Sequence, residues 1–129
     1  MFTKLFGCIT DKGEEGSTVY LSGEIDYAAS LELVPKLDDI MEDCRGDLLF
    51  DLAGVTLIDS EGIKMLLEAV ERMRGRQALS GVVRASKMAD RIMKLLGVCE
   101  LLGAGDNVDP TLTTPLARRF PNVESIPHA

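Results

Sequence analysis

The sequence is poor in the residues on which most catalytic and metal sites depend. Its single histidine, His128, lies beside the chain end, which argues against a histidine-based triad and against a multi-histidine metal site. The three cysteines, Cys8, Cys44 and Cys99, are far apart and form no Cys-x-x-Cys pair. Neither a disulfide framework nor a thiolate zinc site is therefore indicated, and packed, reduced thiols in a cytoplasmic protein fit best.

Basic residues and long apolar runs are also scarce. The chain has 14 lysines and arginines against 21 aspartates and glutamates, a net charge of -7, and such a surface repels phosphate backbones and anionic lipid. No apolar run approaches the roughly 18 residues of a membrane-spanning helix. We therefore expect no direct nucleic-acid binding and no membrane insertion. The 129 residues, 46% of them hydrophobic, fit one domain with a substantial core.

The hydrophobic pattern alternates between strands and helices after an N-terminal hairpin. We predict strands at 2–9, 18–22, 48–52, 55–58, 77–83 and 98–102, with a turn at 53–54. Helices are expected after the capping residues Asp26, Ser60 and Ser86. Leu31 and Val34 belong to the apolar stripe of the first helix, which we expect to kink or split at Pro35. The fold class is thus α/β, with a central mixed sheet of about five strands and helices packed against it.

Ser60 follows a predicted strand and opens a predicted helix, in the run Asp59-Ser60-Glu61-Gly62. As an N-cap, its hydroxyl lies where free backbone N–H groups and the helix dipole favour negative charge. The fold would therefore tolerate a phosphate on Ser60, while a partner surface would be repelled by the added charge. The simpler alternative is that Ser60 is only a helix cap.

Three separate motifs, in this order, resemble the STAS family. They are Gly23-Glu24-Ile25-Asp26, then Asp51-Leu52, then Asp59-Ser60-Glu61-Gly62, and the run from Ser86 to Val98 looks like the family's third helix. The resemblance covers roughly residues 17–102, the expected core of a STAS-like domain at 1–119, with a flexible tail at 120–129. STAS domains occur in anti-sigma factor antagonists and in the tails of sulfate transporters.

The resemblance implies a binding module without enzyme activity. We expect no cofactor, because Gly103-Ala104-Gly105 matches no nucleotide-binding fingerprint. Antagonists of this family bind an anti-sigma factor that is also a serine kinase, and so regulate transcription. The kinase phosphorylates the serine that matches Ser60, which ends the interaction, and a serine phosphatase restores it. By the same match, Asp26, Asp59, Glu61 and Gly62 belong to the partner-binding loop.

Glu61 departs from the family pattern, because many antagonists carry a small residue there. Its carboxylate would crowd a phosphate on Ser60, so a STAS scaffold or transporter-regulatory subunit acting without phosphorylation stays open. A hydrolase using Ser60 lacks a histidine or a nearby lysine to activate the hydroxyl. A cation site at Asp26, Asp51 and Asp59 lacks ligand-loop spacing, so we expect no metal. The sequence leaves monomer and dimer both open.

Overall fold

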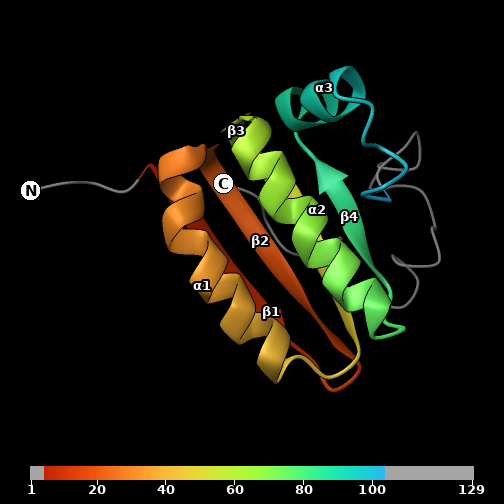
Figure 1. Ribbon diagram of the computed structural model, residues 1–129. Coiled ribbons are helices and arrows are strands. Elements are labelled where there is room, and N and C mark those ends of the chain that lie inside the picture. The colour runs from red at the N-terminus through yellow and green to blue at the C-terminus, as the bar shows by residue number, and fades with distance from the viewer. Residues whose placement is uncertain (1–4, 104–129) are drawn as a thin grey trace, which may run out of the picture.

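The computed structural model describes residues 5–103, which form four strands and three helices (Figure 1). In chain order the elements are β1 (Phe6–Lys12), β2 (Gly16–Ile25), α1 (Tyr27–Asp43), β3 (Asp47–Ile58), α2 (Ser60–Gly75), β4 (Ser80–Ala85) and α3 (Lys87–Leu95). The predicted α/β class is confirmed. The predicted domain boundary at residue 119 and the tail at 120–129 lie outside the described residues.

The four strands form one mixed sheet in the order β1-β2-β3-β4. The hairpin β1–β2 is antiparallel, as predicted, whereas β2, β3 and β4 run parallel. The prediction of a fifth strand at residues 98–102 is wrong, because these residues form no strand. Gly97 closes α3 with a φ of 69°, and the Leu102 N–H then donates to the Val98 carbonyl, which makes a turn. The segment meets the sheet through one hydrogen bond, from Val82 N–H to the Leu102 carbonyl at 2.8 Å.

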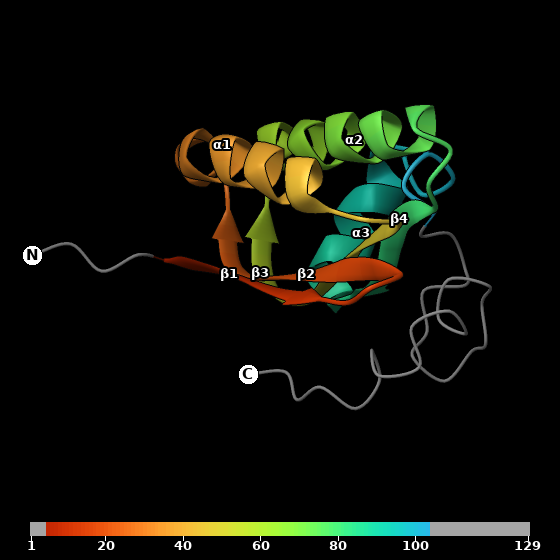
Figure 2. The ribbon, with the colours of Figure 1, turned by 90° about the horizontal axis from the view of Figure 1, so that it is seen from below.

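α1 and α2 lie side by side and form a layer over one face of the sheet (Figure 2). α3 packs against β3 and β4. The centre of the core is β3, where Leu48, Leu49, Phe50 and Leu52 are fully buried, as expected for a central strand. β3 continues through Ala53-Gly54, so the turn predicted there is wrong: an irregularity in its pairing with β2 takes up the extra residue.

α1 differs from its prediction in two ways. It is one helix across Pro35, not two. Leu31 and Val34, predicted to be buried, are exposed, because the buried side is formed by residues 29, 30, 33, 37, 40 and 41. Because the side that includes Ala29 and Ser30 faces the core, Leu31 and Val34 face solvent. Among residues 5–103 no helix has the length and apolar character needed to cross a membrane.

Candidate functional site

The parallel strands β2 and β3 end at the same edge of the sheet, and α1 and α2 begin there. The Asp59 N–H donates to the carbonyl of Ile25, the last residue of β2, at 3.2 Å. The two strand-to-helix turns are thereby joined directly. Edges of this kind are where open α/β sheets usually place their binding sites.

Asp59 holds the start of both helices. One carboxylate oxygen, Oδ1, accepts the Gly62 N–H at 2.9 Å and caps α2, and the other, Oδ2, accepts the Tyr27 N–H of α1 at 3.0 Å. The prediction that Ser60 is the N-cap is therefore wrong. Aspartate and serine are comparable caps. Aspartate has the advantage here that its second oxygen also accepts the Tyr27 N–H of α1.

Ser60 is instead the first residue of α2, and it is exposed. Within residues 5–103 no hydrogen bond holds its side chain. Its hydroxyl lies at the positive end of the α2 dipole, where an added anion is stabilised by about 0.3–1 kcal/mol at an exposed site. Glu61, also exposed, adds a carboxylate to the same first turn.

Gly62 allows α2 to begin against the end of β2. A side-chain Cβ at this position would lie 2.4 Å from the Ile25 carbonyl oxygen and 2.8 Å from Cγ1 of Ile58. Both neighbours are fixed, one in the backbone and one in the core. Any larger residue would push the start of α2, and Ser60 with it, away from the sheet.

Asp26 caps α1 by accepting the Ala29 N–H at 2.9 Å, as the sequence predicted. It directly precedes Tyr27, which is bonded to Asp59, so the structure brings Asp26 to the Ser60 turn. Asp51 is not part of this group, because its buried carboxylate pairs with Arg84 at 2.9 Å inside the sheet. No group of three or more metal-ligating side chains occurs in the described part of the chain.

Sequence reasoning missed the link between Asp59 and Tyr27. That Asp59 caps α2 could have been predicted, since aspartate is as good a cap as serine. The contact to α1 had none, because it joins residues 32 apart in the chain and depends on the two strands ending together.

Two comparisons place this fold among known proteins. The family model for the STAS domain matches residues 10–114. Among solved structures, an anti-sigma factor antagonist from Mycobacterium paratuberculosis is 26% identical, with 74% of this chain and 80% of that chain covered and a TM-score of 0.67.

Two structures of SpoIIAA share the fold at lower identity. The anti-sigma factor antagonist SpoIIAA in its unphosphorylated form is 12% identical, covers 95% of this chain and 100% of its own, and has a TM-score of 0.68. The Bacillus cell fate determinant SpoIIAA in its phosphorylated form is 14% identical, with 74% and 87% covered and a TM-score of 0.59. Comparison with curated protein sequences finds no match.

Proposed function

The chain belongs to the STAS domain family, and on this premise we propose that it is an anti-sigma factor antagonist whose binding is switched off by phosphorylation of Ser60. It acts in the cytoplasm as a binding module without enzyme activity. Its partners are a kinase-type anti-sigma factor, which it sequesters so that a sigma factor is released, and a serine phosphatase that restores the unmodified form. The Mycobacterium paratuberculosis relative is itself an anti-sigma factor antagonist, which supports this assignment.

The observation that carries the proposal is the exposed Ser60 at the start of a helix that Asp59 already caps. A kinase can reach the hydroxyl without opening the fold. A phosphate brings about -1.5 to -2 charges at neutral pH, and the helix N-terminus offsets part of that charge within the domain. The proposal requires that the partner's surface does not offset the added charge in the same way. Since about 1.4 kcal/mol changes affinity tenfold, a repulsion of a few kcal/mol ends binding.

Asp26, Asp59, Glu61 and Gly62 complete the proposed binding loop. Asp59 and Gly62 fix where α2 begins, and Asp26 fixes the neighbouring start of α1. Glu61 is exposed beside Ser60, so its carboxylate is available to a basic group of the partner. The same carboxylate favours a second candidate, a scaffold or transporter-regulatory subunit that works without phosphorylation, because it lies where a phosphate would be crowded.

The test is to incubate the full chain with ATP and, in turn, each anti-sigma factor kinase encoded in the genome of its source organism. Phosphate is mapped by mass spectrometry, and binding is measured by calorimetry. We expect one phosphate at Ser60, none on the Ser60→Ala variant, and unchanged labelling of Thr56→Ala, which removes another exposed hydroxyl.

The charge at position 60 separates the two candidates. Ser60→Asp should weaken kinase binding strongly, and Ser60→Ala should retain it. If no kinase binds the wild-type chain or modifies Ser60, the antagonist proposal fails. Binding to a partner that is equal for Ser60→Ala and Ser60→Asp would select the scaffold.

A further inference from the structure

An exposed apolar row runs along α1 from the Ser60 site. Tyr27, Leu31 and Val34 are 57%, 60% and 41% exposed, and their spacing of four and three residues puts them on one side of the helix. The row starts beside Ser60, because the Tyr27 N–H is bonded to Asp59, the residue that precedes Ser60. Scattered exposed apolar residues are ordinary, whereas contiguous exposed apolar patches often mark interaction sites.

Val34 also lines a groove between α1 and α2, so the row continues into it. The groove is small, about 50 Å³, and its apolar lining comes from both helices: Val34, Leu37 and Met41 of α1, and Met65 and Ala69 of α2. A space of this size accepts the end of one apolar side chain. It does not accept a free ligand of substrate size, since ligand pockets usually measure about 300–1,000 Å³.

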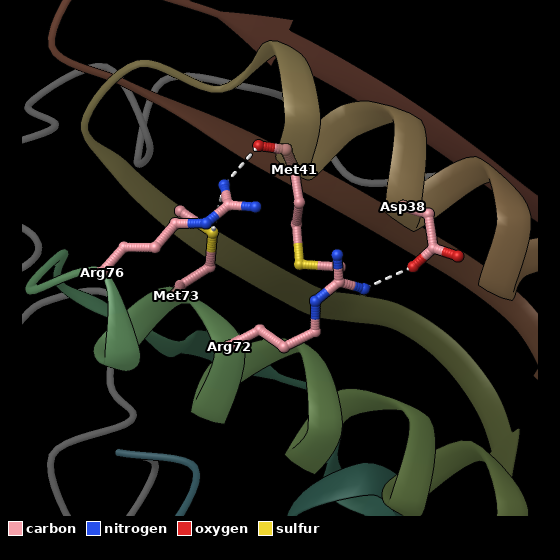
Figure 3. Close-up of polar contacts among 5 residues, drawn as sticks. All are labelled: Asp38, Met41, Arg72, Met73 and Arg76. Atoms are coloured by element: carbon pink, nitrogen blue, oxygen red, sulfur yellow. Dashed lines mark hydrogen bonds and ion pairs between the residues drawn. The ribbon is translucent and has the colours of Figure 1, made fainter.

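Two arginines at the C-terminal end of α2, Arg72 in the helix and its C-cap Arg76, contact α1 beside the groove. Arg72 reaches across to the Asp38 carboxylate, and Arg76 donates to the backbone carbonyl of Met41 at 2.7 Å, as Figure 3 shows. Both contacts join the C-terminal end of α2 to α1, at the end of the groove away from Ser60. A preformed groove lowers the ordering cost of binding a partner.

The charge around the row indicates what kind of surface fits it. α1 carries five acidic residues and one basic residue, but Asp38 is paired with Arg72 and Asp43 with Lys12. The Asp38–Arg72 pair lies in the groove, and Glu68 of α2 adds a further carboxylate to the lining. Glu61 adds a further carboxylate near the start of the row. A complementary surface therefore presents an apolar side chain bordered by lysine or arginine. A second copy of this acidic face does not meet that requirement.

We propose that the kinase-type anti-sigma factor docks along the row Tyr27–Leu31–Val34 and inserts an apolar side chain, bordered by basic residues, into the groove between α1 and α2. This inference rests on the proposed function. It gives the kinase a second contact region, separate from the phosphorylated hydroxyl. Docking along this row contributes most of the affinity of the kinase for this chain, whereas phosphorylation of Ser60 causes the complex to dissociate.

The test uses the full chain and the kinase that modifies or binds the wild-type protein in the screen above. Leu31→Ala should raise the Kd about tenfold, the loss typical of an interface residue that matters, and Leu31→Lys about a hundredfold. Leu95→Lys is the matched control, because Leu95 is 71% exposed on α3 and should bind within about twofold of wild type.

Phosphorylation kinetics separate docking from chemistry. Leu31→Ala should raise KM for phosphorylation of Ser60 with kcat nearly unchanged, because a docking contact is made equally in the ground state and the transition state. Thermal unfolding of the variants should match that of the wild type, since the Leu31 side chain is largely exposed.

The failures of the two proposals are distinguishable. If the wild type is bound and modified but both Leu31 variants behave like it, the docking surface is wrong and the antagonist function stands. If no kinase acts on the wild type, both proposals fall. If sedimentation shows that Leu31→Lys converts a dimer into a monomer while kinase affinity is unchanged, the row is a self-association face and the docking proposal is overturned.

Discussion

Asp59 should contribute more to folding than the cap of either of the other two helices. Its carboxylate accepts one N–H from α2 and one from α1, at 2.9 and 3.0 Å, whereas Asp26 and Ser86 each accept one N–H. Removing an N-cap side chain costs about 0.5–2 kcal/mol. A second hydrogen bond to a charged acceptor adds about 1.5 kcal/mol, the lower end of its range because the site is partly exposed.

Asp59→Ala is therefore expected to lower the free energy of unfolding by about 2–3.5 kcal/mol. Asp26→Ala and Ser86→Ala should each cost about 1 kcal/mol. Asp59→Asn should fall between these values. Its amide oxygen can still cap α2, but its amide nitrogen is a donor and cannot accept the Tyr27 N–H.

The measurement is urea unfolding of the full chain, followed by far-ultraviolet circular dichroism because the protein has no tryptophan. A shifted midpoint with an unchanged slope reports stability alone. The reasoning is refuted if Asp59→Ala and Asp26→Ala are equally destabilised, or if Asp59→Asn is as unstable as Asp59→Ala. The first result would mean that the bond to Tyr27 contributes nothing, and the second that the bond to Gly62 contributes nothing.

Three further predictions concern the core and a thiol. Gly62→Ala should destabilise the fold by about 1–3 kcal/mol, because the new Cβ overlaps the Ile25 carbonyl; unchanged thermal unfolding would contradict this. Arg84→Met should cost about 3–5 kcal/mol in urea unfolding, since it leaves the buried Asp51 carboxylate without its cation, and adding Asp51→Asn should recover part of the loss. Burial raises the pKa of the Cys8 thiol, partly offset by Lys36, so iodoacetamide at pH 8 should modify it several-fold more slowly than in the urea-unfolded chain, as peptide mass spectrometry would show.

The sequence was sufficient for features that depend on local rules. The hairpin, the helices, and the caps at Asp26 and Ser86 follow from residue types over a few positions, and the structure has all of them. The buried run of β3 was also predictable, because only a central strand is apolar on both faces. These features place the Ser60 turn at the correct edge of the sheet.

The remaining features depend on contacts between distant elements. Helical spacing shows which residues share a face but not which face meets the sheet, and so Leu31 and Val34 were assigned to the core. Residues 98–102 are apolar enough for a strand, yet Gly97 reverses the chain and a turn forms instead. Both differences depend on how a segment packs against the rest of the fold, which the local pattern does not show.

The finding that Asp59, and not Ser60, caps α2 bears on the proposed phosphorylation of Ser60. A serine that caps a helix through its hydroxyl loses that hydrogen bond when the oxygen is esterified, so folding would oppose the modification. Here the carboxylate of Asp59 accepts the Gly62 N–H, so the Ser60 side chain does not cap the helix. Under the proposed phosphorylation, charge added at Ser60 therefore breaks no helix-capping hydrogen bond, and its main effect falls on the proposed complex.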